Sequence, residues 1–108
     1  MMYLISYDVT DNKTRKKIAD ILLDYGSRVQ YSVFECDISN KRYKEMYRKL
    51  VSEVEDKEEV SIRCYFLDKT SMDRLEIIGS PTYQGLNSDD IKKYDVGGLT
   101  KEEELLFI

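Results

Sequence analysis

Residues 28–37, RVQYSVFECD, carry apolar side chains on both alternations of a β-strand. A strand with one face in a core and one in water alternates apolar and polar residues. Here the odd-numbered positions 29, 31 and 33 are apolar and the next one is Glu35. The even-numbered positions 28, 30 and 32 are polar, and the next two are Phe34 and Cys36. A βαββαβ order of elements needs two strands joined by a hairpin in this part of the chain, so we expect a bend near Tyr31–Ser32 that divides the segment into two strands.

The rest of the chain alternates strand-like and helix-like segments. In chain order we expect a strand at 2–8, a helix from Asp11 or Asn12 to about Tyr25, the divided segment at 28–38, a helix from Ser39 or Asn40 to Val54, a strand at 60–68 and a short strand at 74–79. Gly26 is expected to end the first helix in the left-handed conformation. This order, with two helices for one sheet, predicts an α+β fold: a ferredoxin-like βαββαβ sandwich with an extra short C-terminal strand.

The predicted sheet has apolar side chains on both faces, yet two helices can cover only one. We assign the following apolar residues to the uncovered face: Tyr3, Ile5, Tyr7, Phe34, Tyr65 and Leu67. An uncovered apolar face of this size is normally an interface. We therefore expect a homodimer that packs sheet to sheet.

The absence of histidine restricts the possible chemistry. It removes His-based acid–base catalysis and Ser-His or Cys-His nucleophile pairs. The two cysteines, Cys36 and Cys64, lie in strand-like runs, so we expect buried thiols rather than a disulfide or a zinc site. Hydrolysis would then depend on a cation that is held by carboxylates and activates water.

The net charge of −4 is unevenly distributed along the chain. Residues 1–50 contain ten Lys or Arg against seven Asp or Glu, and residues 51–108 contain seven against fourteen. The basic residues form two clusters, at 13–17 and at 41–49, where the members are Lys13, Arg15, Lys16, Lys17, Lys41, Arg42, Lys44, Arg48 and Lys49. Solvated helix faces are one interpretation. A local phosphate-binding surface is the other.

The first residues and the hydropathy of the chain predict its location. Met1–Val9 has no basic leader and no cleavage site, and no apolar run approaches the length that spans a membrane. We expect a cytoplasmic protein with no membrane partner.

Two runs carry a resemblance to a known family. YLISYDVTDNKTRKKIADILLDYGSRVQYSVFECDIS and the later SIRCYFLD resemble the second family of CRISPR-associated proteins, over residues 2–79. The resemblance implies a small metal-dependent endonuclease that partners the CRISPR integrase, with two ferredoxin-like subunits packed sheet to sheet. Residues 1–79 would form the nuclease domain. We expect residues 80–108, a C-terminal extension outside the pattern, to dock on the partner subunit or on the integrase.

The resemblance also implies the site residues. Asp8, at the end of the first strand, matches the metal-binding aspartate, and the pair from two subunits would hold Mg²⁺ or Mn²⁺ and catalyse the cleavage. Three basic positions match those that would bind nucleic acid: Arg15, Lys17 and Arg28. Tyr7 and Phe34 would support the site. Without the resemblance, Asp8 would be read as ordering a turn and the basic residues as solvated.

Three functions follow from these observations. The first is an endonuclease on RNA or DNA that acts in spacer acquisition as the dimeric partner of the integrase. The second is a non-catalytic architectural dimer that bridges integrase subunits. The third is a toxin-like ribonuclease.

Overall fold

The structure, a computed structural model, describes residues 1–79. Its elements in chain order are β1 (Met2–Val9), α1 (Asn12–Leu23), β2 (Ser27–Gln30), β3 (Val33–Asp37), α2 (Asn40–Val54), β4 (Val60–Leu67) and α3 (Lys69–Asp73). The expectation that residues 80–108 dock on a partner lies outside the described residues. Within the described part, none of the helices has the length and apolar character needed to cross a bilayer.

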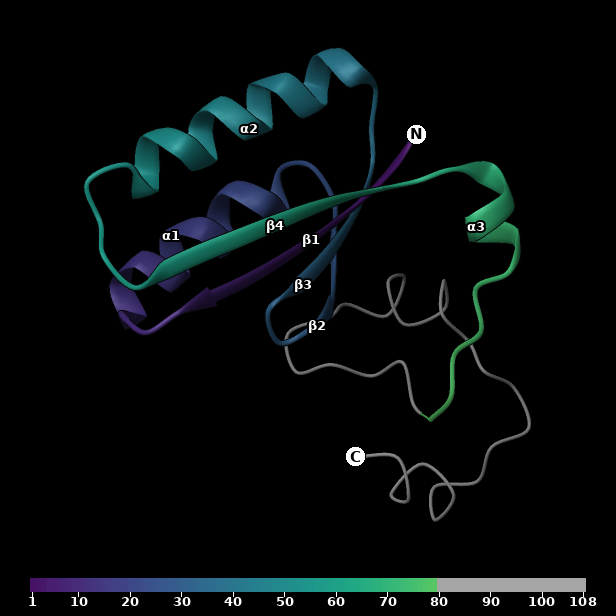
Figure 1. The fold of residues 1–108 in the computed structure, drawn as a ribbon, viewed down its shortest axis with the longest axis horizontal. Helices are drawn as coiled ribbons and strands as arrows, with labels where there is room; N and C mark the ends of the chain where they lie inside the picture. Colours follow the sequence, from purple (N-terminus) through teal and green to yellow (C-terminus); the bar gives the residue numbers. More distant parts are fainter. Residues whose placement is uncertain (80–108) are drawn as a thin grey trace.

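The four strands form one antiparallel sheet in the order β2-β3-β1-β4. Figure 1 shows α1 and α2 packed against one side of this sheet, and within residues 1–79 neither of these two helices covers the other side. The βαββαβ order and the ferredoxin-like arrangement are therefore confirmed.

The segment at 28–37 is divided as the expected order of elements predicts. β2 ends at Gln30, residues 31 and 32 form a turn, and β3 begins at Val33. The pairing of β2 with β3 also shifts register between Arg28 and Gln30. After the turn, Phe34 and Cys36 face the helices and are fully buried. The turn thus explains how both alternations of this short run can carry apolar residues.

The expected apolar set of the uncovered face is wrong for four of its six members. Tyr3, Ile5, Tyr7 and Phe34 lie under the helices in the core. The reason is the register of β1, which aligns Ile5 with Phe34 on one side and with Cys64 on the other and so gives all three the same face. Tyr65 and Leu67 alternate with Cys64 and lie on the open face, as expected.

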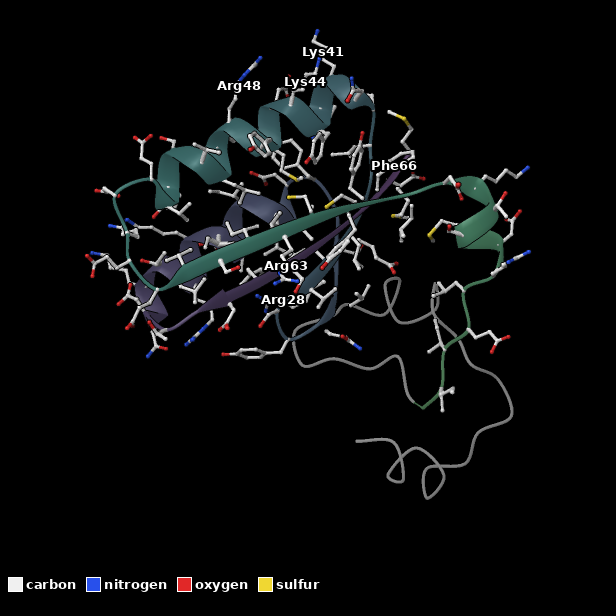
Figure 2. The ribbon with its side chains drawn as sticks, in the orientation of Figure 1. Arg28, Lys41, Lys44, Arg48, Arg63 and Phe66 are labelled. Carbon is white, nitrogen blue, oxygen red and sulfur yellow. The ribbon has the colours of Figure 1, made fainter. Side chains whose placement is uncertain are left out.

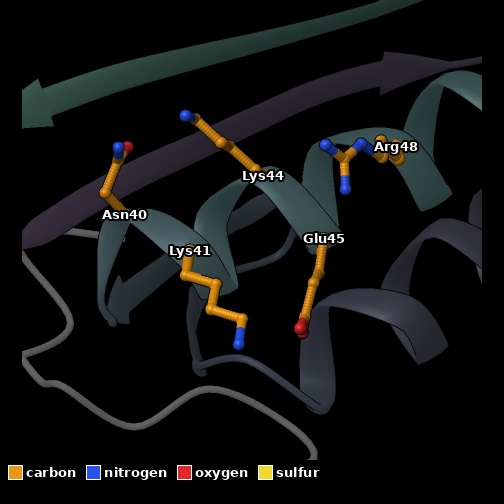
Figure 3. A pocket seen from close by; sticks show the side chains of 5 residues that line it. All are labelled: Asn40, Lys41, Lys44, Glu45 and Arg48. Carbon is orange, nitrogen blue, oxygen red and sulfur yellow. The ribbon is translucent and has the colours of Figure 1, made fainter.

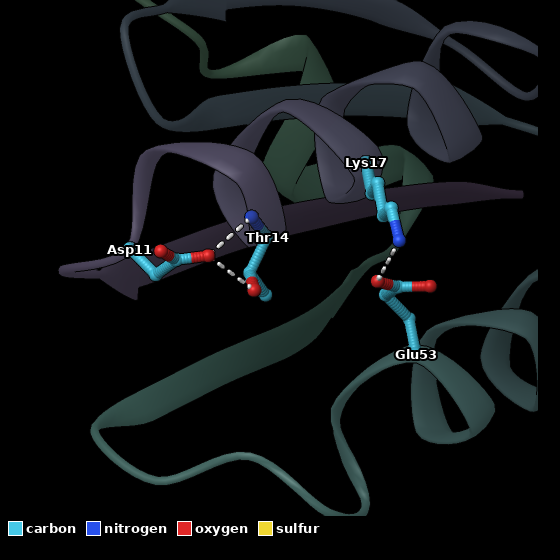
Figure 4. Close-up of polar contacts among 4 residues, drawn as sticks. All are labelled: Asp11, Thr14, Lys17 and Glu53. Carbon is cyan, nitrogen blue, oxygen red and sulfur yellow. Dashed lines mark hydrogen bonds and ion pairs between the residues drawn. The ribbon is translucent and has the colours of Figure 1, made fainter.

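Two capped helices complete the core on the covered side. The Asp11 carboxylate accepts hydrogen bonds from the backbone amide of Thr14 at 2.8 Å and from its hydroxyl at 2.7 Å, and these bonds lower the pKa of Asp11 (Figure 4). The Ser39 hydroxyl caps α2 by accepting from the amide of Arg42 at 3.2 Å. Each helix buries an apolar stripe against the sheet, with Ile18 and Leu22 from α1 and Met46 and Leu50 from α2.

The expected short strand at 74–79 is absent. Asp68 instead accepts a hydrogen bond from the amide of Ser71 at 2.8 Å and starts α3, and residues 74–79 adopt no regular structure. A strand needs a neighbouring strand for its backbone hydrogen bonds. In the part of the chain that the structure describes, this segment pairs with neither edge of the sheet.

Gly26 is required by close packing and not by a left-handed helix end. Its φ is not positive, and its amide donates to the carbonyl of Leu22 at 3.0 Å. A Cβ atom at this position would lie 2.2 Å from the carbonyl oxygen of Glu35 and 2.6 Å from the sulfur of Cys36. The glycine therefore allows the end of α1 to pass directly against β3.

Gly26→Ala should lower the free energy of unfolding by about 3 kcal/mol, because the methyl group can be accommodated only if β3 moves. Urea denaturation followed by circular dichroism measures this loss. Ser52→Ala, on the exposed side of α2, is the control and should leave the transition in place. An unchanged midpoint for Gly26→Ala would contradict the close approach.

Tyr43 links α2 to the sheet and should make stability depend on alkaline pH. Its ring stacks on Tyr3 with centroids 4.0 Å apart, and its hydroxyl donates to the thiol of Cys64. Burial and then this hydrogen bond raise the pKa of Tyr43 from 10.0 to about 12. The stabilisation from the neutral phenol is therefore complete below the unfolded pKa of 10.0 and is lost as the pH rises towards about 12.

Urea unfolding at several alkaline pH values tests this dependence. The free energy of unfolding should fall more steeply between the two pKa values for the wild-type chain than for Tyr43→Phe, which has no phenol to ionise. Parallel curves for the two proteins would contradict a buried neutral Tyr43.

Candidate functional site

Asp8 lies on the open face of the sheet, at the C-terminal end of β1. Tyr7 and Val9 on either side of it are buried under the helices, so the alternation of the strand turns Asp8 to the opposite face, where it is exposed. Its partner on the neighbouring strand β4 is Ser61. The structure thus presents this carboxylate at the end of a central strand, on the face opposite to α1 and α2.

Arg63 is a basic residue of this face that the sequence analysis did not select as a site residue. It lies opposite Ser6 on β4, one position along the same face from the Asp8–Ser61 pair. Its guanidinium donates to the hydroxyl of Tyr65 at 3.5 Å, and this contact raises the pKa of Arg63. The alternation of polar and apolar residues in 60–67 could have indicated Arg63, because the polar positions of this strand all lie on the open face.

One chain supplies a single carboxylate at this position. Within residues 1–79, no group of three or more Asp, Glu or Cys side chains is arranged to hold a metal ion. Proteins commonly bind Mg²⁺ through one or two carboxylates together with water molecules, and a second copy of Asp8 would supply a second carboxylate. The position of Asp8 on the open face makes this possible, because two sheets that pack through these faces can bring their strand ends together.

Tyr7, Arg28 and Phe34 lie together, but on the covered face and not beside Asp8. The Arg28 guanidinium donates to the Tyr7 hydroxyl at 3.2 Å and lies 5.2 Å from the centre of the Phe34 ring. The Tyr7 hydroxyl also donates to the carbonyl of Tyr31 at 3.5 Å. This cluster fixes the β2–β3 turn against β1, so its effect on Asp8 passes through the strand that Tyr7 and Asp8 share.

Arg15 and Lys17 also contact other parts of the chain. Arg15 donates to the carbonyl of Val9 at 2.9 Å and to the side chain of Asn12, and its guanidinium lies 5.8 Å from the ring centre of Tyr31. Lys17 forms an ion pair of 3.8 Å with Glu53 that joins α1 to α2, as Figure 4 shows. The Glu53 carboxylate thus partly offsets the charge of Lys17, whereas Arg15 keeps its charge but uses part of its hydrogen-bonding capacity within the chain.

The basic residues of the second cluster, at 41–49, lie on two different sides of α2. Arg42 and Lys49 turn towards the first helix and lie 4.7 Å and 5.1 Å from the ring centre of Tyr25. The remaining three, Lys41, Lys44 and Arg48, point away from the sheet (Figure 2) and line a shallow hollow with Asn40 and Glu45 (Figure 3).

Similarity to known proteins covers the described part of the chain. The family model described as CRISPR associated protein Cas2 matches residues 1–75. A CRISPR-associated endoribonuclease Cas2 of Synechocystis sp. is 42% identical over 80 residues, which is 74% of this chain and 86% of the relative. A second one, from Chloroflexus aurantiacus, is 43% identical over 79 residues, which is 73% of this chain and 85% of the relative.

Solved structures show the same fold. The crystal structure of Streptococcus pyogenes Cas2 superposes with a TM-score of 0.64 at 36% identity, and the match covers 73% of this chain and all of that one. A chain of a partial Cas6-RT-Cas1–Cas2 complex gives the same TM-score and identity, with coverage of 71% and 83%.

Proposed function

The chain belongs to the Cas2 family of CRISPR-associated proteins, and on that premise we propose that it is a metal-dependent endonuclease that acts in spacer acquisition as the dimeric partner of the CRISPR integrase. The observation that carries this proposal is the position of Asp8, an exposed carboxylate at a strand end on the open face. The relatives that are named endoribonucleases support the activity, and the relative within a Cas1–Cas2 complex supports the integrase as partner.

The open face supports a sheet-to-sheet dimer. Leu4 pairs with Tyr65, and Met2 pairs with Leu67, so apolar side chains from β1 and β4 lie next to one another on this face. Tyr65 keeps 44% of its surface exposed. Met2 is already buried in the single chain, but a second copy of the same face would bury Tyr65 and the partly exposed Leu4 and Leu67. This gain in hydrophobic burial is the physical basis of the proposed dimer.

The dimer would complete the metal site. Two Asp8 carboxylates would hold a Mg²⁺ or Mn²⁺ ion, since hard divalent cations prefer oxygen ligands. A bound divalent cation supplies two effects, polarisation of the phosphoryl oxygen and activation of a water. Arg63 lies on the same face and would contribute positive charge where the phosphodiester binds. Tyr7 and Arg28 hold the strand that positions Asp8.

A second candidate function is architectural. It is supported by the solved relative that belongs to a Cas1–Cas2 complex, because a protein that only bridges integrase subunits needs the dimer and no metal. The two functions share the same fold and dimer, and they differ in what the loss of the Asp8 carboxylate does.

Asp8→Asn should abolish cleavage and leave the fold, the dimer and the integrase complex intact, since the amide keeps the shape of the side chain and removes its charge. Cleavage of labelled RNA and DNA with Mg²⁺, together with a spacer-insertion assay, measures both roles. Ser61→Ala, a change at the paired position, is the control. Wild-type cleavage by Asp8→Asn would refute the catalytic role, whereas insertion by that variant with no cleavage by the wild type would favour the architectural role.

Tyr65→Glu should weaken the dimer at least tenfold, or about 1.4 kcal/mol, because it places a charge in the apolar part of the open face. Light scattering over a range of protein concentrations gives the dissociation constant. The matched control is Tyr47→Glu on α2, where a tyrosine of similar exposure lies on the helix layer. If both variants dimerise as the wild type does, the open face is not the interface.

A further inference from the structure

We propose that residues 102–108 of this chain, EEELLFI, dock on its own helix layer, where two cations of α2 adjoin an exposed apolar strip. We define the apolar strip as Tyr47 and Val51 of α2 and Phe66 of β4. The inference goes beyond the proposed nuclease and architectural functions, because it concerns neither Asp8 nor the open face and depends on neither function.

The apolar strip is exposed but continuous with the core. Tyr47, Val51 and Phe66 keep 50%, 41% and 55% of their surface accessible. Two further rings connect them. Tyr43 lies 6.1 Å from Tyr47 between ring centres, and Tyr3 lies 4.0 Å from Tyr43 and 5.5 Å from Phe66. An apolar surface that is held in place from below gains free energy when a further apolar segment covers it.

Two cations border the strip along α2. Lys44 precedes Tyr47 by three residues and Arg48 precedes Val51 by three, so each cation lies beside an apolar member of the strip. Both cations are exposed and point away from the sheet, as Figure 2 shows. Within residues 1–79, no ion pair joins either of them to a carboxylate. A segment that fits this surface should therefore carry acidic residues next to apolar ones.

Residues 102–108 have this composition. Glu102, Glu103 and Glu104 are followed directly by four apolar residues, Leu105, Leu106, Phe107 and Ile108. The apolar run matches the strip, and the glutamates match the two cations beside it. Opposite charges at short range stabilise the docked arrangement, and burial of the apolar run supplies the larger part of the free energy. The surface and the segment are thus complementary in both charge and hydrophobicity.

The chain between the described part and this segment is long enough to reach the strip. Fully extended, residues 80–101 would span about 70 Å. The longest dimension of the structure is 45 Å. Phe66 also lies close in sequence to α3, from which the chain continues to residue 79. Because the segment and the surface belong to one molecule, docking is favoured by a high effective concentration.

A single tryptophan in the full chain tests the docking, because the sequence contains no tryptophan. Phe107→Trp keeps an aromatic ring in the segment and gives it a specific fluorescence signal. Acrylamide quenching then measures how accessible this ring is, and a docked ring should be shielded. The measurement needs neither metal nor nucleic acid, so its failure and the failure of the nuclease proposal are distinguishable.

Loss of the strip should release the tryptophan. In the Phe107→Trp protein, Tyr47→Ser/Val51→Ser should raise the ratio of undocked to docked segment about tenfold, because two apolar contacts are removed. The matched control, Leu23→Ser/Leu75→Ser, removes two exposed apolar side chains elsewhere and should leave the quenching unchanged. Circular dichroism verifies that both variants keep their helices.

Charge reversal is the second part of the test. Lys44→Glu/Arg48→Glu should also expose the tryptophan, because the glutamates of the segment would then meet like charges. Glu102→Lys/Glu103→Lys/Glu104→Lys in the same protein should restore the shielding, since opposite charges face each other again.

Three results would overturn the proposal. The first is a tryptophan that is as accessible in the Phe107→Trp protein as in a free peptide of the segment. The second is equal exposure in Lys44→Glu/Arg48→Glu and in the control Lys57→Glu/Lys69→Glu, which reverses two exposed cations elsewhere. The third is renewed shielding when the charge-reversed protein is mixed with the wild-type chain, which would mean that the segment docks on another copy.

Discussion

The pairing of β1 with strands on both sides is the constraint on which the rest of the structure depends. Because β1 is central, its register sets the faces of β3 and β4 together, and Ile5 lies between Phe34 and Cys64. This alignment collects the apolar side chains under the helices. It also turns every second residue, Asp8 among them, to the open side. The core and the candidate site thus lie on opposite faces of the same strand.

The same layering separates the basic residues by their surroundings. Arg15 and Arg28 bind carbonyl, hydroxyl and ring groups near the β2–β3 turn and so stabilise the strand end that carries Asp8. Lys41 and Arg48 project from the outer side of α2. A chain with a net charge of −4 can therefore still present a cationic surface, because screening makes the local arrangement more important than the total.

Much of the fold could be predicted because its signals are local. The break at Tyr31–Ser32 followed from the number of strands that the βαββαβ order needs, and the caps at Asp11 and Ser39 followed from residue type. The strand expected at 74–79 is absent because an apolar local pattern does not determine whether a segment reaches a sheet edge, and this segment pairs with neither edge strand, β2 or β4, in the described residues. Gly26 was expected to provide a left-handed helix end, but it is needed because β3 passes too close for a side chain. That contact joins segments that are distant in the sequence, so no local pattern indicates it.

The sequence by itself determined the order of the elements, the lack of histidine chemistry and the location of Asp8 at a strand end, because periodicity, composition and adjacency are properties of the chain alone. Only the tertiary structure decided which face each strand turns to the helices. Register joins residues that are far apart in sequence, and a shift of one position exchanges the two faces. The observed register buries Phe34, exposes Asp8 and places Arg63 on the same face as Asp8.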